Sequence, residues 1–509
     1  MLLLQHKYVI IFVEKKQVVG AKMRKKLLTI TILVGFLGLN ILPTYAGILS
    51  MGVIKSSITK SKTDYIHTDT DKEIISKTNA KSRADKRKLK DYKVKNKYDF
   101  INNIWWENFG DDCLNDYIQK AIEHNYDAKI ATLNVDEYYH NVKSQFSNEL
   151  PSVGAGFLPG YGGGGSGSDS GFFAVPVCVN YELDLFQKNH DKTKSTKKTY
   201  EASIQDERAA YISIVSAVGT TYLNIVKSDK LISTQENIVN LRKDIYQMML
   251  LSNQKGTTST SDVVKANKSL VAGQSDLIDL QRQRIQLLNQ LAVLIGESPA
   301  NVDSLKRSSY EKIKYGYNMP ETISSEIITQ RPDFMKAELM LEKSGIDVRV
   351  AKKDFLPKLN IGGLALFNAP NLGSILTTNN TLWGIGGYAF ESLYTGGKKT
   401  ATLRIKKVQY EKALENYKKT NLVSIQEVND AMYKYKYSND KYKQNLIHQN
   451  LESQDFALSQ KKFQQGVISK LDLNQMQENL LDINKLVVSN KLDCMIDSIG
   501  LYKATGTKY

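Results

Sequence analysis

The stretch FQQGVISKLDLNQMQENL, residues 463–480, holds a single glycine inside a very long run of helix-forming sequence. Neither Gly nor Pro occurs from Lys398 to Gln465, and neither occurs for 33 residues after Gly466. Glycine adopts the left-handed backbone conformation that ends many helices, so Gly466 predicts a reversal between two antiparallel helices. Asp472 falls near the start of the second helix, where a carboxylate meets the positive end of the helix dipole.

The same pattern occurs 210 residues earlier, in LSNQKGTTSTSDVVKANKSLV, residues 251–271. An alignment of the two stretches pairs Gly256 with Gly466 and Asp262 with Asp472. Further upstream, two Leu-Pro pairs repeat with an offset of 206. We therefore predict an internal duplication, in which each half has the order helix, two strands, long helix, glycine tip and helix.

Four segments alternate apolar and polar side chains with the period of β-strands. In VPVCVNYELDLF, residues 175–186, every second side chain is apolar. Alternating segments of about ten residues are typical of transmembrane barrel strands, although a strand of a soluble sheet can alternate in the same way. The predicted strands are 152–160, 172–186, 358–368 and 381–394. The aromatic residues predicted to form interfacial girdles are Phe157, Phe172, Phe173, Trp383, Tyr388, Phe390 and Tyr394.

Four strands cannot close a barrel on their own. Open strand edges cannot lie in lipid, because each unpaired backbone group there costs several kcal/mol. A membrane-spanning sheet of this kind therefore needs several chains. Two chains would give eight strands and a barrel filled by side chains, whereas three would give twelve strands and room for a pore. We predict three chains.

The net charge of +16 lies almost entirely in the N-terminal fifth of the chain. Residues 1–46 have the basic, apolar and small-residue order of a secretory signal peptide, with an uncleaved membrane anchor as the alternative. Within them, residues 1–22 precede a more natural start at Met23. Residues 47–98 are polar and Lys-rich, which predicts a basic disordered linker. The first 98 residues carry +14 and the other 411 carry +2, so we expect no nucleic-acid partner.

No motif points to an enzyme. The glycine-rich stretch at 160–171 precedes a predicted strand, whereas a dinucleotide site needs a helix there. The histidines form no HExxH or triad-like group. Cys113, Cys178 and Cys494 fit no metal-binding spacing, and none lies near the predicted cleavage site to carry a lipid. We expect no catalytic residue, no cofactor and no metal ion.

From about Trp105 to Gly506 the chain resembles the TolC-like outer-membrane efflux proteins, the outer-membrane factors of multidrug pumps. The motifs that carry the resemblance are WWENFGDDCLNDYIQKAIEHNYD, ELPSVGAG, YELDLF, TQRPDFMKAELMLEKSGIDVRVAKKDFLPKLNIGG, LYTGGKK and FQQGVISKLDLNQMQENLLD. The resemblance implies an α+β membrane protein. Its trimeric, 12-stranded transmembrane β-barrel, with four strands per chain, would continue into a long periplasmic α-helical barrel. The first repeat would span 99–300, an equatorial connector 301–332 and the second repeat 333–509.

The resemblance also implies partners and site residues. Family members dock by their helix tips onto a periplasmic membrane-fusion adaptor, which is coupled to an inner-membrane pump. The corresponding docking residues here are Gly256, Thr257, Gly466, Val467, Ser469 and Lys470. Acidic rings past the second glycine constrict the tunnel mouth in the family. Asp472 matches the first ring, Gln475 stands where the second would be, and Asp262 is the counterpart in the first tip. The alternative role of both aspartates is to stabilise a helix N-terminus.

These observations lead to one functional hypothesis and two alternatives. We expect a passive exit duct in the outer membrane, surrounded by its lipid, that conducts small molecules or drugs. A type I protein-secretion duct would have the same fold. A soluble periplasmic helical scaffold would share the helices but would not need detergent for extraction.

Overall fold

The computed structural model describes residues 105–162, 170–314, 323, 326–375 and 381–506. The chain divides by its contacts into residues 1–92 and 93–509, and every described residue belongs to the second unit. The predicted signal peptide at 1–46 and the predicted linker at 47–98 lie outside the described residues.

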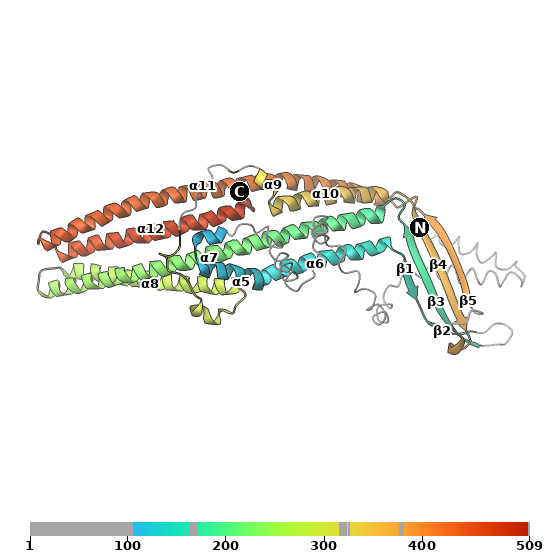
Figure 1. Ribbon diagram of the computed structural model, residues 1–509, viewed down its shortest axis with the longest axis horizontal. Coiled ribbons are helices and arrows are strands. Elements are labelled where there is room, and N and C mark those ends of the chain that lie inside the picture. Colours follow the sequence, from blue (N-terminus) through green and yellow to red (C-terminus); the bar gives the residue numbers. More distant parts are fainter. Residues whose placement is uncertain (1–104, 163–169, 315–322, 324–325, 376–380, 507–509) are drawn as a thin grey trace, which may run out of the picture. The chain divides into compact units, whose positions relative to one another are not determined.

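Two long helical hairpins make up most of this unit (Figure 1). The first joins α7 (Lys188–Gln254) to α8 (Thr260–Leu294), and the second joins α11 (Lys398–Gln464) to α12 (Lys470–Thr505). Both α7 and α11 contain 67 residues, which corresponds to about 100 Å of helix. The shorter elements are α5 (Asp112–His124), α6 (Tyr126–Phe146), α9 (Glu326–Thr329), α10 (Pro332–Lys353), η4 (Trp105–Phe109), η5 (Ser147–Glu149), η6 (Pro299–Ser304) and η7 (Leu372–Ser374).

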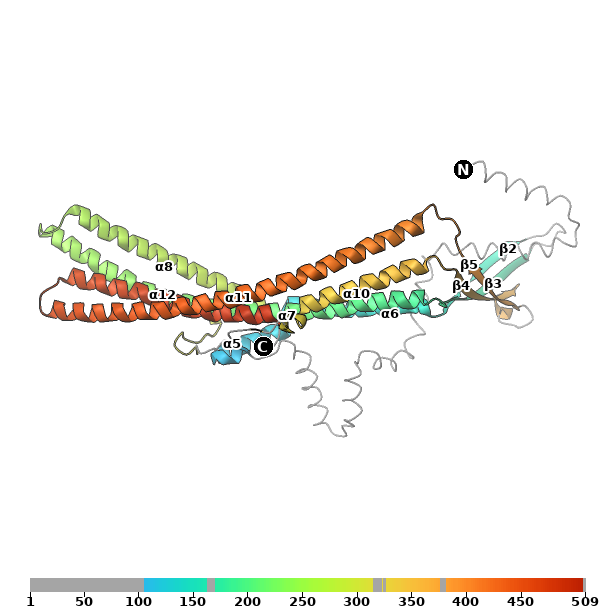
Figure 2. The same ribbon diagram turned by 90° about the horizontal axis from the view of Figure 1, so that it is seen from above.

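The helices pack side by side in an order that changes along the unit (Figure 2). In the part nearer the sheet, α6 contacts α7, α7 contacts α10, and α10 contacts α11. Toward the tips, α8 contacts α7, α7 contacts α12, and α12 contacts α11. Only α7 and α11 run through both parts. A segment of α7 is apolar enough to cross a membrane, but most of it is buried against its neighbours, as in the core helix of a protein.

One antiparallel sheet stands at the end of the helices opposite the tips (Figure 1). Its strands are β1 (Ser152–Ala155), β2 (Leu158–Gly162), β3 (Ser170–Leu183), β4 (Lys358–Ala369) and β5 (Thr381–Phe390). β4 pairs with β3 on one side and with β5 on the other, while β1 and β2 both pair with the remaining edge of β3. The described sheet therefore ends in two edges, one formed by β1 and β2 and the other by β5.

Three of the four predicted strands differ from the structure by more than two residues at an end or by an interruption. The segment 152–160 is not one strand but two, interrupted at Gly156 and Phe157. Both pieces nevertheless follow one continuous register along β3, with Ser152 opposite Asn180 and Leu158 opposite Ala174. They therefore fill the place of a single strand.

The other two errors lie where a strand meets a helix. β3 ends at Leu183 rather than at 186, because the carboxylate of Asp184 accepts hydrogen bonds from the backbone N–H groups of Lys188 (2.6 Å) and His190 (2.8 Å). These bonds satisfy backbone N–H groups in the first turn of α7. β5 ends at Phe390 rather than at 394, and the left-handed residues Gly396 and Gly397 then turn the chain into α11.

The register sorts the alternating side chains onto two faces of the sheet. Val177, Ala365 and Trp383 are direct cross-strand partners, so they share one face, and that face is apolar from edge to edge. The opposite face includes Asn180, Glu182 and Asn360. Of the seven predicted girdle aromatics, Phe173 and Trp383 lie on the apolar face, but Phe172, Tyr388 and Phe390 lie on the other face. Those three aromatics therefore do not share a face with Phe173 and Trp383.

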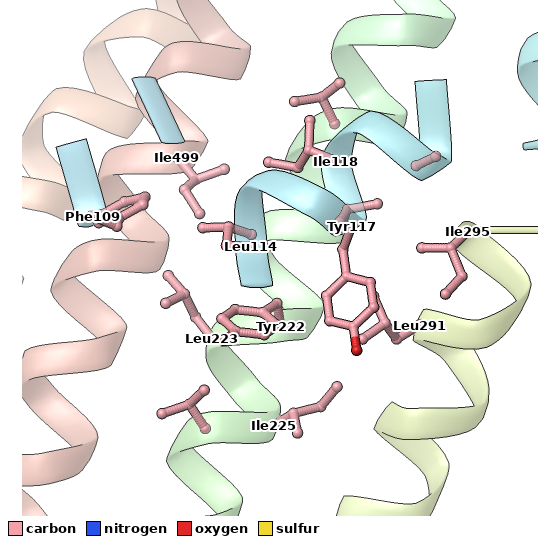
Figure 3. Close-up of a cluster of buried hydrophobic side chains, with 14 of the residues drawn as sticks. Phe109, Leu114, Tyr117, Ile118, Tyr222, Leu223, Ile225, Leu291, Ile295 and Ile499 are labelled. Atoms are coloured by element: carbon pink, nitrogen blue, oxygen red, sulfur yellow. The ribbon is translucent and has the colours of Figure 1, made fainter. Parts of the chain in front are cut away.

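The main hydrophobic core lies about midway along the helices, where α5 packs against α7, α8 and α12 (Figure 3). Leu114, Tyr222, Leu291 and Ile499 are among its fully buried members. The described part of the predicted connector contributes as well, because Ile313 is buried in the same core.

A buried polar network ties these elements together. The Tyr222 hydroxyl donates to Asp111 (2.6 Å) and accepts from the backbone N–H of Ser308 (3.1 Å). Asp111 also accepts from the Ser308 hydroxyl (2.9 Å) and from the N–H of Cys113 at the start of α5 (2.9 Å). The network is satisfied, so it fixes α5 and the connector against α7 without leaving a buried polar group unpaired.

Candidate functional site

The two helix tips have the same backbone geometry. Gly256 and Gly466 both adopt left-handed conformations, with φ of 74° and 76°. The residue after each glycine donates its N–H back into the preceding helix, from Thr257 to the Ser252 carbonyl (2.9 Å) and from Val467 to the Lys462 carbonyl (2.9 Å). This six-residue return is the Schellman motif, which closes a helix C-terminus. The glycines therefore do what the sequence predicted: they reverse the chain.

A serine begins the next helix at each tip. The Ser469 hydroxyl accepts from the N–H of Asp472 (3.1 Å), and an Asp472 carboxylate oxygen accepts from the Ser469 N–H (3.0 Å). The pair forms a capping box. In the first tip the Ser259 hydroxyl accepts from the Asp262 N–H (3.1 Å) and donates to its carboxylate (2.7 Å).

These contacts lower the pKa of both tip aspartates. For Asp472 the causes are hydrogen bonds from the Ser469 side chain and then from its backbone. For Asp262 they are hydrogen bonds from Ser259 and then from Lys265, whose amino group lies 3.2 Å away. The helix-starting role considered for these aspartates is thus present in the structure. It leaves a carboxylate on the surface that stays ionised well into the acid range.

All the predicted tip residues are at the end of the helices opposite the sheet (Figure 1). Asp472, Gln475 and the six predicted docking residues are exposed, and Asp262 is half-buried. Val467 is a large apolar side chain with 68% of its surface exposed. Gln475 donates to Asn479 (3.4 Å) one turn further along α12.

A row of polar contacts between α7 and α12, which the sequence did not suggest, joins the two hairpins. Arg242 pairs with Glu478 (2.7 Å), the Lys485 amino group donates to Gln235 (2.7 Å), and Lys227 pairs with Asp493 (2.7 Å). The residue numbers of the two partners add to the same total in all three pairs, as expected for antiparallel helices in one register. We call this row the α7–α12 seam.

Arg242 is the member of the seam nearest the tips, and it holds three helices. Besides its ion pair with Glu478 on α12, its guanidinium donates to the Ser269 carbonyl of α8 (2.9 Å). Both charged side chains of the pair are largely buried. A buried ion pair of this kind is costly to break, because the remaining charge has no partner.

A second polar cluster lies where α10 begins, at the edge of a cleft of about 720 Å³ between α7, α10, α11 and α12. Arg331, whose side chain is 8% exposed, binds both carboxylate oxygens of Asp333 (2.9 and 2.7 Å) and also Glu427 on α11 (2.5 Å). It donates to the Ala504 carbonyl near the end of α12 as well. The cluster therefore joins three helices.

These polar contacts hold neighbouring helices together. Within the described residues, no group of His, Cys, Asp or Glu side chains could hold a metal ion.

Comparisons with known proteins agree with this picture. The family model described as outer membrane efflux protein matches residues 117–297 and 323–507, one segment in each half. The chain is 25% identical over 416 residues to the probable efflux pump outer membrane protein TtgC of Pseudomonas putida, covering 79% of this chain and 84% of that one. It is 23% identical over 426 residues to the cation efflux system protein CusC of Escherichia coli O157:H7, covering 81% and 90%. Among solved structures, the Campylobacter jejuni CmeC outer membrane channel superposes with a TM-score of 0.72 at 22% identity, covering 79% of this chain and 87% of that one.

Proposed function

This chain belongs to the outer membrane efflux protein family, and on that premise we propose that three copies form the outer-membrane channel of a tripartite efflux system. As a member of the family, the protein resides in the outer membrane, with its helices in the periplasm. The channel would conduct small molecules passively, from a periplasmic adaptor and an inner-membrane pump to the exterior. The observation that carries the proposal is a sheet with two open edges, continuous with a helical array that has two uncovered apolar edges.

The open sheet edges support an oligomer. β5 and the line formed by β1 and β2 each pair on only one side within the described residues. Unpaired backbone groups are costly in lipid, so the edges of neighbouring chains must pair if the sheet spans the membrane. Three sheets joined edge to edge would make a closed twelve-stranded barrel, with the apolar face toward lipid and the polar face toward the lumen.

The outer helices support the same arrangement. On α8, the exposed side chains of Val264, Val271, Ile278 and Ile285 recur every seven residues. On α11, at the opposite edge of the helical array, Leu451 and other large apolar side chains are also exposed. Apolar residues at a seven-residue spacing are typical of helices that pack against a partner helix. Because the two edges differ, contacts between copies would run head to tail and close into a ring.

The tips would form the periplasmic mouth. Three copies of Asp472 would lie around one axis, where like charges repel and can hold cations. With Gln475 at the second position, the mouth would carry one acidic ring. Opening would separate the second hairpin from the first at the tips. This movement would break the α7–α12 seam near Arg242. The exposed tip residues, with Val467 as the apolar contact, would bind the adaptor.

Two measurements test the proposal. If the protein is a membrane channel, it should leave the outer membrane only in detergent, whereas a soluble periplasmic scaffold would be extracted without it. Purified protein in lipid vesicles should then release an entrapped small dye. Vesicles that retain their dye, with protein correctly inserted, would reject the conduit.

A further inference from the structure

Three of the four places where a helix meets the sheet share an unusual surface pattern. Each of the three connecting turns carries a leucine beside an aromatic residue. The pairs are Leu185 and Phe186 before α7, Phe355 and Leu356 after α10, and Leu393 and Tyr394 before α11. All six side chains are exposed, and Leu393 and Tyr394 reach 97% and 90% exposure. We call these six residues the rim pairs.

A lysine follows each rim pair within five residues. Lys188 follows the first, Lys358 the second and Lys398 the third, directly before Lys399. The strand register brings the three turns together at the end of the sheet that faces the helices, because Leu183 pairs with Leu359 and Lys358 with Phe390. In this subsection, 'edge' means this end of the strands. The described chain thus presents apolar side chains and cations together along that edge.

The exposed apolar side chains of the rim pairs are unfavourable in contact with water. Large apolar patches on a protein surface mark contacts with a partner or a membrane. Tyr and Trp are enriched at the membrane–water interface, where their rings lie at headgroup level, and Lys or Arg side chains near the surface are attracted to anionic lipids there.

Two of the basic side chains are available to a ligand. Lys188 and Lys399 pair with Asp354 and Glu391. Lys352, in the last turn of α10, and Lys398, the first residue of α11, are exposed and make no ion pair within the part of the chain that the structure describes. They are therefore the cations best placed to meet phosphate groups.

We propose that the rim pairs and these lysines seat the protein in the periplasmic leaflet of the outer membrane and bind the phosphates of anionic phospholipids there. The inference rests on the proposed function, because it requires the sheet to cross the membrane. The occupant follows from charge complementarity and from continuity with the lipid-facing surface of the sheet. In this arrangement the rim pairs lie at headgroup depth, and Lys352 and Lys398 reach the phosphates.

Tryptophan fluorescence tests the depth of the rim. Purified full-length protein is reconstituted in phospholipids that carry bromine on the acyl chains, which quenches nearby indoles. Trp383, exposed on the apolar face of the sheet, reports whether the sheet lies in the bilayer. In a Trp383→Phe background, Tyr394→Trp should be quenched most by bromine close to the headgroup. Val467→Trp in the same background, at the distant tip, should not be quenched.

The outcomes separate this inference from the proposed function. If Trp383 is quenched but Tyr394→Trp behaves like Val467→Trp, the rim does not meet lipid and the inference fails, while the membrane-spanning sheet stands. That result would also be expected if a second copy of the chain covered the rim. If Trp383 itself is not quenched, the sheet is not in the bilayer and both proposals fail.

The lysines have their own test. Lys352→Gln with Lys398→Gln should weaken the apparent affinity for phosphatidylglycerol, titrated into phosphatidylcholine nanodiscs and read from the unfolding midpoint. The loss expected is about fivefold for each lysine. Lys436→Gln with Lys441→Gln, exposed on α11 away from the sheet, removes the same charge and should change nothing. Equal effects of the two pairs would overturn the lysine contacts.

Discussion

Asp472 has two physical roles that a single substitution can separate. Its carboxylate closes the capping box with Ser469, and its charge would line the proposed mouth. Asp472→Asn keeps an oxygen that can accept from the Ser469 N–H but removes the charge. We expect this variant to raise single-channel conductance, or to weaken block by divalent cations, in planar bilayers. Ser469→Ala removes the cap and keeps the charge, so it should leave both properties nearly unchanged.

The pH dependence of the block follows from the direction of the pKa shift. Hydrogen bonds from Ser469 lower the pKa of Asp472 below that of an ordinary aspartate, so its charge is present at neutral pH. Divalent block should therefore persist on acidification and disappear only as the pH falls through the lowered pKa. Block that is lost already near pH 6, or block that Asp472→Asn does not change, would remove this residue from the gate.

Two glycines in helix interiors should respond in opposite ways to an added methyl group. A Cβ on Gly219 of α7 would lie 2.8 Å from the Trp105 ring and 3.0 Å from Ile499, whereas a Cβ on Gly500 of α12 meets nothing within 4 Å. We expect Gly219→Ala to destabilise the protein by about 1–3 kcal/mol through overpacking. Gly500→Ala should stabilise it by about 0.5–1 kcal/mol. Unfolding midpoints in detergent measure both, and equal shifts would contradict the packing described around Trp105.

At the scale of elements, the α7–α12 seam decides how firmly the two hairpins hold together. Glu478→Ala should destabilise the protein by about 3 kcal/mol, because it leaves the largely buried Arg242 without its counter-charge. It should also raise the open probability, since the seam is the contact that opening must break. Replacing both residues by leucine should recover most of the stability. If Glu478→Ala has the same stability and the same open probability as the unaltered protein, the seam does not take part in gating.

The elements also differ in how far the sequence predicts them. The long helices and their tips follow from local signals, namely the absence of Gly and Pro and the glycine at each reversal. The seam has no such signal, because Arg242 and Glu478 are far apart in sequence and meet only through the register of two helices. The end of β3 was predicted wrongly for a related reason. The alternation of side chains continues past Leu183, and the end of the strand depends on the Asp184 side chain, which binds the first turn of α7.

The interruption at Gly156 and Phe157 and the aromatic faces were missed for different reasons. Alternation continues through the interruption, and only the missing backbone pairing at Phe157 divides β1 from β2. The girdle prediction took the seven aromatic residues together because of their residue type. Neighbouring residues of a strand, however, point to opposite faces of the sheet. Phe172 and Phe173 therefore lie on opposite faces of the sheet. For the tip aspartates, the structure shows the helix-starting role as a capping box between Ser469 and Asp472.

At the scale of the whole molecule, assembly should depend on the apolar stripe of α8. Ile278 is exposed on that stripe, and Ile278→Asp places a charge where a neighbouring copy would pack. We expect the variant to lose the trimer, as measured by native mass spectrometry in detergent. Gln283→Asp, at an exposed position turned away from the stripe, should remain trimeric. Trimers with Ile278→Asp would show that the interface lies elsewhere.

In the proposed assembly, several copies of this chain together enclose one water-filled path across the outer membrane. Single-channel recording of the purified protein in planar lipid bilayers tests it most directly. A channel of this kind should give discrete, uniform conductance steps that grow when the charge of Asp472 is removed. Bilayers that contain inserted protein but pass no current, both with the unaltered chain and with Asp472→Asn, would contradict it.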